Sequence, residues 1–217
     1  MKSRTRIMKY AIILAAGSGN RFGGKKQYED LNGKPVYQFS LDAFSGMADE
    51  ILMVVPDGDK PDVAVKTVVG GKERYDSVYA ALCAISADDD DLVAIHDAAR
   101  PGVTKDIIER TYKTAQQDGA AVAVTLVTDT IRTVDGELID RNKLRAMQTP
   151  QTFRYGIIRK AYDKLYGSDE MNGITDDVEV VRRALNIKAT MVEGDFRNMK
   201  ITVRKDLDAL LNQLTDF

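Results

Sequence analysis

Cysteine and histidine are almost absent from this chain of 217 residues. The single cysteine, Cys83, cannot form an internal disulfide, so nothing in the sequence indicates an oxidising compartment. One histidine, His96, and one cysteine cannot together build a tetrahedral zinc site of His and Cys ligands. These scarcities exclude a disulfide-stabilised secreted module and a zinc centre of that kind.

The chain also lacks an excess of charge of either sign and any long hydrophobic run. Lys and Arg number 31 against 33 Asp and Glu, so the net charge of −2 provides no attraction to nucleic acid or to an anionic membrane. No stretch approaches the roughly 20 apolar residues of a membrane-spanning helix. Basic residues precede the apolar run Tyr10–Ala16 as in a signal peptide, but a run of seven residues is at the short limit. We therefore expect a cytoplasmic protein with no nucleic-acid or membrane partner, a buried first strand, and a frayed leader over residues 1–8.

Short apolar runs alternate with segments of helical periodicity along the chain. The predicted strands are Tyr10–Leu14, Glu50–Val55, Val63–Val69, Leu92–His96, Ala120–Leu126 and Ala189–Val192. The predicted helices are Pro35–Phe44, Asp76–Ile85, Lys105–Gln117, Asp176–Leu185 and Lys205–Leu214, with Thr175 as the N-cap of the fourth. The acidic run Asp88–Asp91 is typical of a solvated loop. Such alternation predicts an α/β fold, in one domain over residues 1–217, with a mainly parallel sheet flanked by helices.

One segment departs from this alternation. Asp135-Gly136 separates the two β-like runs Thr130–Val134 and Glu137–Ile139, which is a strong hairpin signal. We interpret residues 127–148 as a β-arm that leaves the main sheet. Because a hairpin cannot bury both of its faces alone, we expect the arm to pack on a second subunit in a homodimer.

A glycine-rich loop, residues 14–27, follows the first predicted strand. Glycines let backbone N–H groups approach phosphate oxygens closely, and ligands bind at the carboxyl ends of parallel strands. Arg21, Lys25 and Lys26 add positive charge. The combination suits a polyphosphate.

Three phosphate-loop patterns compete for this segment. The dinucleotide pattern G-x-G-x-x-G fails because its third glycine falls on Phe22. The Walker A pattern nearly fits, with matches at Gly19, Gly24 and Lys25, but Lys26 stands where a Ser or Thr must bind Mg²⁺. A nucleotidyltransferase loop, Leu-x-x-Gly-x-Gly-x-Arg with a later Lys, fits at every position, namely Leu14, Gly17, Gly19, Arg21 and Lys26.

Four further motifs follow in order along the chain. They are Gly70–Val78, His96–Pro101, Asp140-Arg141-Asn142 with Gln148-Thr149-Pro150-Gln151, and Thr175-Asp176 with Asn198–Thr202. With these motifs the chain resembles the cytidylyltransferases of sugar-alcohol phosphates, most closely the 2-C-methyl-D-erythritol 4-phosphate cytidylyltransferase family, from Tyr10 to about Leu214. The resemblance implies a Rossmann-like nucleotidyltransferase fold.

The resemblance also implies roles for particular residues. CTP would contact Ala15, Ala16, Gly17, Gly19, Gly71, Arg74, Ser77, Asp97 and Ala98. The polyol phosphate would contact Asp97, Arg100, Thr130, Arg141, Thr149, Thr175 and Lys200. Arg21 and Lys26 would stabilise the transition state, whereas Arg141 and Lys200 would orient the substrate phosphate. Asp97 is the candidate ligand for Mg²⁺ or another divalent cation, and His96 has the pattern of a structural residue.

The implied activity is transfer of CMP from CTP to 2-C-methyl-D-erythritol 4-phosphate. In such enzymes the arm reaches the partner's substrate site, so Thr130, Arg141 and Thr149 would serve the other protomer. Two alternatives remain at this point: a ribitol 5-phosphate cytidylyltransferase, because the two acceptors differ little around the phosphate, and a non-catalytic nucleotide-binding module on the same fold.

Overall fold

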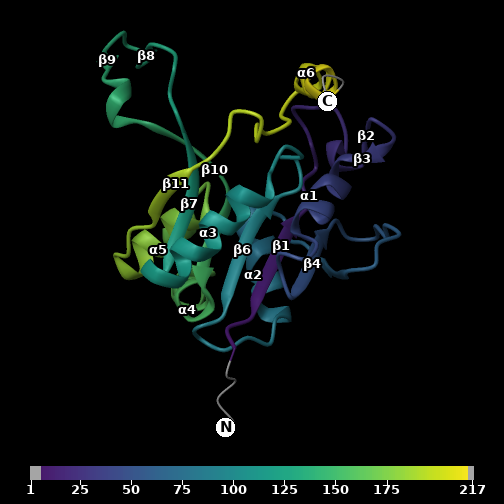
Figure 1. Ribbon diagram of the computed structural model, residues 1–217. Coiled ribbons are helices and arrows are strands. Elements are labelled where there is room, and N and C mark those ends of the chain that lie inside the picture. The colour runs from purple at the N-terminus through teal and green to yellow at the C-terminus, as the bar shows by residue number, and fades with distance from the viewer. Residues whose placement is uncertain (1–5, 215–217) are drawn as a thin grey trace.

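The computed structural model describes residues 6–214 and is built around a seven-stranded sheet (Figure 1). The strands are β1 (Lys9–Leu14), β4 (Glu50–Val55), β5 (Lys66–Val69), β6 (Leu92–Asp97), β7 (Ala120–Leu126), β10 (Arg145–Arg154) and β11 (Thr190–Glu193). Their order is β11-β7-β10-β6-β1-β4-β5, and every neighbouring pair is parallel except those that β10 makes with β6 and β7. The predicted α/β fold with a mainly parallel sheet is confirmed.

Helices cover both faces of the sheet, so alternate residues of each central strand enter different cores. On β1, Ala11 and Ile13 pack in the core formed with α1 (Val36–Phe44) and α3 (Lys105–Asp118). Tyr10 and Ile12 face the opposite core. That core also contains side chains of α2 (Arg74–Ala84), α4 (Tyr155–Leu165) and α5 (Asp177–Leu185). Burial on both faces explains why these strands are continuously apolar in sequence.

A third, smaller cluster lies beside the sheet's carboxyl edge. It joins Phe22 of the glycine loop to Ile201 and to Leu207 and Leu210 of α6 (Arg204–Leu214). The short elements η1 (Lys26–Tyr28), β2 (Asp30–Leu31) and β3 (Lys34–Pro35) connect the glycine loop to α1. Because Phe22 and Ile201 share this cluster, their neighbours Arg21 and Lys200 are carried by segments that pack together.

The predicted arm projects from the body of the molecule (Figure 1). It holds β8 (Ile131–Arg132), β9 (Leu138–Ile139) and the 3₁₀ turn η2 (Arg141–Lys143), and β10 begins at Arg145. Gly136 has φ of +92°, which a tight turn at the predicted Asp-Gly position requires. Val134 and Leu138 are exposed on the arm.

Three local expectations need correction. The N-cap of α5 is Asp176, whose side chain accepts a hydrogen bond from the N–H of Glu179 at 2.9 Å, and not Thr175. Asp91 is not solvated, because its carboxylate is buried and accepts hydrogen bonds from the backbone N–H groups of Met8 and Asp88. The strand predicted from Val63 begins only at Lys66.

The sequence also left β10 and α4 unpredicted. β10 carries four buried polar side chains together with a proline, so it has neither the apolar run nor the alternation of a strand; the four are Gln148, Thr149, Gln151 and Thr152. A register shift between Met147 and Gln151 accommodates this segment against β7.

Part of the expected leader, residues 1–5, lies outside the described residues. Residues 6–8 are attached to the fold, because Arg6 pairs with Asp49 at 2.7 Å and Met8 donates to Asp91. Within residues 6–214, no helix has the length and apolar character needed to cross a membrane.

Candidate active site

A pocket of about 620 Å³ opens where β1 ends between β4 and β6. The chain runs from β1 to β4 on one side and later to β6 on the other, so this is the switch point of the sheet, where α/β proteins bind ligands. The lining comes from four segments that are far apart in sequence, namely residues 14–21 with Lys26 and Gln27, residues 71–74 with Ser77, Asp97 with Ala99, and Lys200 with Thr202. The first, second, third and fifth sequence motifs therefore meet in one cavity.

The glycine loop forms a tight turn at the edge of this pocket. The carbonyl oxygen of Gly19 accepts hydrogen bonds from the N–H groups of Phe22, Gly23 and Gly24 at 2.9 to 3.3 Å. Gly19 has φ of +68°, and a Cβ there would lie 1.8 Å from the carbonyl oxygen of Gly24. Only glycine fits this position. Gln27 is buried and donates to the carbonyl oxygen of Gly17 at 3.2 Å, which holds the two ends of the loop together.

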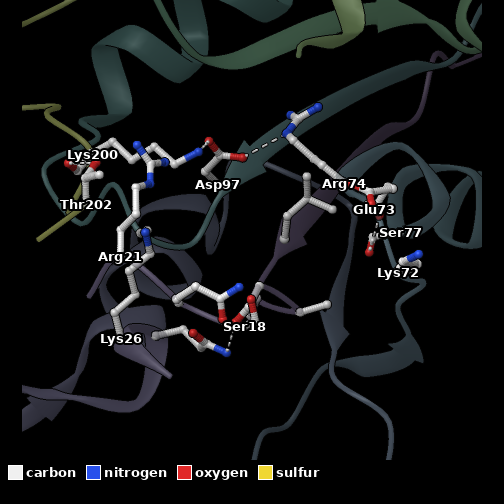
Figure 2. A pocket seen from close by; sticks show the side chains of 18 of the residues that line it. Ser18, Arg21, Lys26, Lys72, Glu73, Arg74, Ser77, Asp97, Lys200 and Thr202 are labelled. Carbon is white, nitrogen blue, oxygen red and sulfur yellow. Dashed lines mark hydrogen bonds and ion pairs between the residues drawn. The ribbon is translucent and has the colours of Figure 1, made fainter. Parts of the chain in front are cut away.

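Three cations of the predicted set share one end of the pocket. Figure 2 shows Arg21, Lys26 and Lys200 pointing toward the region beside Asp97. Burial lowers the pKa of Lys26, and the nearby positive charges of Lys200 and Arg21 lower it further. A site that places like charges this close is arranged for a strongly anionic ligand.

Asp97, at the end of β6, is the carboxylate between these cations and the rest of the pocket. Lys200 Nζ donates to Asp97 Oδ2 at 2.7 Å, and Arg74 Nε donates to Asp97 Oδ1 at 3.2 Å. Burial opposes ionisation, but the charges of Arg74, Lys200 and Arg100 hold the pKa of Asp97 well below its usual range. Asp97 is therefore an anion at every physiological pH.

The turn before α2 forms the other end of the pocket. Ser77 Oγ accepts from the N–H of Gly71 at 3.2 Å and donates to the carbonyl oxygen of Glu73 at 3.4 Å. Asp76 accepts from the N–H of Glu73 at 2.9 Å, which caps the helix. Gly71, Arg74 and Ser77 all line the pocket, as their predicted contact with CTP requires.

Two predicted substrate residues lie behind Asp97 and do not line the pocket. Arg100 donates to the backbone carbonyl oxygens of Asn198 at 2.9 Å and of Met147 at 3.4 Å, so it ties the Lys200 segment to the start of β10. Thr149 is buried, and its hydroxyl accepts from the N–H of Asp97 at 3.1 Å.

His96 is wholly buried beside these two residues. Its Nε2 lies 3.2 Å from the carbonyl oxygen of Arg100, which can only accept, so Nε2 carries the proton. Nδ1 then accepts from the Thr149 hydroxyl at 3.0 Å. Burial lowers the pKa of His96 to about 4, so the imidazole is neutral at pH 7. These contacts give His96 a structural position and no access to the pocket.

The remaining predicted residues lie elsewhere. Ala98 is buried and its place in the lining is taken by Ala99. Thr175 is exposed before α5, and Thr130 and Arg141 are exposed on the arm, outside this chain's own pocket. Arg141 donates to the carbonyl oxygen of Thr128, which fixes its side chain along the arm.

The sequence predicted that Lys25 adds positive charge to the pocket, and this prediction is wrong. Lys25 Nζ contacts both carboxylate oxygens of Asp59 at 2.7 Å, and Lys25 is absent from the lining. A Walker A lysine would have to face the phosphates, so this contact also argues against that pattern.

Several lining residues had no site role predicted from the sequence. They are Leu14, Ser18, Asn20, Gln27, Lys72, Glu73, Ala99 and Thr202. Each lies within or beside a motif, so proximity to motif residues was the available signal.

Asp97 is also the residue that fits a divalent cation. Mg²⁺ is usually held by one or two carboxylates together with substrate phosphates and water. Each Asp97 oxygen has one protein donor within hydrogen-bond distance and so retains acceptor capacity. Among the described residues no group of three or more His, Cys, Asp or Glu side chains is placed to hold a metal without a substrate.

Comparison with known proteins gives consistent matches over nearly the whole chain. The family model of 2-C-methyl-D-erythritol 4-phosphate cytidylyltransferase (IspD) matches residues 9–213. The enzyme of that name from Lachnospira eligens is 40% identical over 221 residues, covering 93% of this chain and 96% of the relative. The one from Clostridium perfringens is 38% identical over 217 residues, covering 91% and 94%.

Solved structures agree. The 2-C-methyl-D-erythritol 4-phosphate cytidylyltransferase of Thermus thermophilus superposes with a TM-score of 0.82 at 30% identity, covering 94% of this chain and 98% of that one. The Francisella tularensis enzyme gives 0.83 at 30% identity, covering 95% and 99%. Together with the glycine loop and the shared cationic pocket, these matches show that the chain belongs to the 2-C-methyl-D-erythritol 4-phosphate cytidylyltransferase family.

Proposed function

We propose that this protein transfers CMP from CTP to 2-C-methyl-D-erythritol 4-phosphate, releasing pyrophosphate, in isoprenoid precursor synthesis in the cytoplasm. The observation that carries the proposal is the common cavity that Arg21, Lys26 and Lys200 share with the glycine loop. Family membership selects the reaction from the many that a polyphosphate pocket could support.

The chemistry needs position and charge more than it needs a base. A phosphate oxygen of the acceptor attacks the α-phosphorus of CTP in line, a new P–O bond forms, and the bond to the β-phosphate oxygen breaks. Because the nucleophile is already anionic, no side chain must remove a proton. The barrier comes from bringing two anions together, which cations and amide dipoles lower.

Each side chain then has a part in this scheme. Arg21 and Lys26 line the pocket and would hold the triphosphate and its developing charge. Lys200 would orient the acceptor phosphate beside Asp97. Gly71, Arg74 and Ser77 would bind the cytosine end. Asp97 would hold Mg²⁺, which supplies further neutralisation of phosphate charge when bound.

The acceptor site is proposed to be completed by a second copy of the chain. Thr130 and Arg141 lie on an arm that leaves the body, and two strands of two residues cannot form a stable unit alone. Exposed Val134 and Leu138 on the arm would be covered in a homodimer. The partner's Arg141 would then reach the acceptor phosphate.

A substrate panel tests the reaction. The purified chain is given Mg²⁺ with CTP or another nucleotide, and with methylerythritol phosphate, ribitol 5-phosphate or a sugar 1-phosphate. Product mass and released pyrophosphate are measured. We expect the cytidylylated methylerythritol product. Turnover with ribitol phosphate in preference to methylerythritol phosphate would make ribitol phosphate the acceptor. No product and no pyrophosphate release with any acceptor would leave only a nucleotide-binding module.

Adjacent lysines provide a matched pair of variants for the same assay. Lys26→Ala should lower kcat by about 10²–10³-fold, as loss of one charge-stabilising donor does. Lys25→Ala should stay near wild type, since Lys25 pairs with Asp59 away from the pocket. If the two substitutions lowered kcat equally, Lys26 would not have the proposed role in stabilising the transition state.

Subunit complementation tests the arm. Lys26→Ala and Arg141→Ala chains with different tags are co-expressed and the heterodimers are isolated. If the arm serves the partner, one of the two sites is intact and about half of wild-type activity returns. If Arg141 serves its own chain, both sites are damaged and the heterodimer stays inactive.

A further inference from the structure

A line of hydrogen-bonded polar side chains runs from the core to the pocket. The hydroxyl of Tyr162, on α4, donates to Asp177 Oδ1 at 2.7 Å. Arg74 Nη2 donates to Asp177 Oδ2 at 2.8 Å, and Arg74 Nε donates to Asp97 at 3.2 Å. The line ends on Lys200, 2.7 Å from Asp97. Asp177 and Tyr162 are fully buried and lie outside the pocket lining, whereas the other three line it.

Asp177 is held in place by its main chain as well as by its carboxylate. It is the first residue of α5, and the buried side chain of Gln151 accepts from the N–H groups of Asp177 and Val178 at 2.9 and 3.1 Å. Gln151 belongs to β10, the strand beside β6, which carries Asp97. The carboxylate of Asp177 is therefore fixed relative to the sheet edge that forms the site.

This arrangement fixes the guanidinium of Arg74 from two sides. Burial opposes the charge of Arg74, but Asp177 and Asp97 hold its pKa well above the usual value. One edge of the Arg74 guanidinium faces Asp177 and another faces Asp97, so rotation of this side chain would break a charged hydrogen bond. Arg74 is thus held rigidly in the wall of the pocket.

Without the charge of Asp177, the balance around Asp97 would change. Asp97 would be the remaining carboxylate for Arg74 and Lys200, and for Arg100, whose Nε is 3.9 Å away. Arg74 would then be pulled toward Asp97 and away from its present position. The effect would reach the pocket although Asp177 itself does not.

We propose that Asp177 is a positioning residue for CTP, acting through Arg74. The proposal rests on the cytidylyl-transfer function above, because it needs CTP to occupy the pocket beside Arg74. Tyr162 holds Asp177 in place by its hydrogen bond, so it also helps to position Arg74, although its effect is smaller.

The main experiment compares Asp177→Asn with Glu179→Gln by calorimetric CTP titration and by steady-state kinetics. Glu179 is the matched control, because it is a carboxylate on the same helix that pairs with Arg182 and Arg183 away from the pocket. Asp177→Asn should raise the Kd for CTP about tenfold with unchanged stoichiometry, as expected for a weakened charged contact, while Glu179→Gln binds normally. If Asp177 served only to stabilise the fold, Asp177→Asn would instead lower the stoichiometry of CTP binding and leave the Kd of the folded molecules for CTP unchanged.

Two further variants keep the proposal decidable if Asp177→Asn folds poorly. Tyr162→Phe leaves the carboxylate in place and should raise the Kd for CTP by a smaller factor. In the Arg74→Met background, adding Asp177→Asn should weaken CTP binding no further, and the double variant carries no unpaired buried charge. Additive losses, or an unchanged Kd in Asp177→Asn or Tyr162→Phe, would overturn the proposal. An inactive wild-type enzyme that binds CTP normally would overturn only the transfer function.

Discussion

Lowering the pH from 7 to 5 should destabilise this protein through one side chain, His96. The imidazole is wholly buried, packs against Phe44 with ring centroids 5.5 Å apart, and is hydrogen-bonded as the neutral Nε2–H tautomer. Burial lowers its pKa from the usual 6.5 to about 4. Between these values the unfolded chain binds a proton that the folded chain does not. The contribution of the neutral imidazole to the folding stability is therefore fully present above pH 6.5 and is lost as the pH falls toward 4.

The size of the effect follows from the two pKa values. The pKa of His96 is about 4 in the folded chain and about 6.5 in the unfolded chain. Because of this difference, the free energy of unfolding falls by about 2 kcal/mol between pH 7 and pH 5. The paired carboxylates do not obscure this window. Glu179, for example, has its pKa lowered from 4.5 to about 2 by hydrogen bonds from Arg182 and Arg183, so the stability that it contributes is lost only as the pH falls below about 4.5 toward 2. For a domain whose total stability is typically about 5–15 kcal/mol, such a loss is easily measured.

The assay is urea unfolding at pH 7, 6 and 5, combined with an NMR titration of the imidazole. His96 is the only histidine of the chain, so its ring resonance needs no assignment. The resonance should stay unchanged down to pH 5, and His96→Asn should lose most of the slope of stability against pH. A ring that titrates near pH 6.5 in the folded protein would refute the reasoning.

Three further predictions concern the glycine loop. Because its pKa is lowered, Lys26 should lose its proton, and kcat/KM for CTP should fall, at a lower pH than in the Lys26→Arg enzyme; pH–rate profiles on the alkaline side check this. Gly19→Ala should weaken CTP binding at least about tenfold in calorimetry, because φ is positive and Cβ would meet the Gly24 carbonyl, whereas Gly24→Ala has open space. Removing the exposed Lys25–Asp59 pair by Lys25→Ala should leave the urea midpoint of unfolding close to that of the wild type, because exposed ion pairs contribute little to stability.

The sequence predicted the site's residue types better than their contacts. The motif spacing correctly brought Arg21, Lys26, Asp97 and Lys200 to one sheet edge, because parallel strands end on the same side. It could not show that Lys25 turns to Asp59, since adjacent loop lysines are chemically equivalent until the backbone is known. A side chain's direction in a loop depends on tertiary contacts that no local pattern encodes.

β10 illustrates the same limit for the fold. Three of its four buried polar residues, Gln148, Thr149 and Gln151, are hydrogen-bonded to groups far along the chain, such as the N–H groups of Asp97 and Asp177. Hydrophobic periodicity detects strands only where burial selects apolar side chains. Here burial selects hydrogen-bonding groups that organise the site, so the segment with the greatest positional importance has the weakest strand signal. Arg100 follows this logic too, because its charge pattern suggested a phosphate ligand while its donors serve two backbone carbonyls.

Asp97 has a purpose in the pocket that does not depend on any metal. Burial lowers the pKa of Lys26, repulsion from Lys200 and Arg21 lowers it further, and the charge of Asp97 raises it. The carboxylate therefore helps to keep Lys26 protonated while the pocket is empty. When a triphosphate enters, its own negative charge favours the protonated lysine still more strongly. Arg74 holds one oxygen of Asp97 and Lys200 holds the other. The single carboxylate thus reduces the repulsion among the cations of the pocket before the anionic substrates bind.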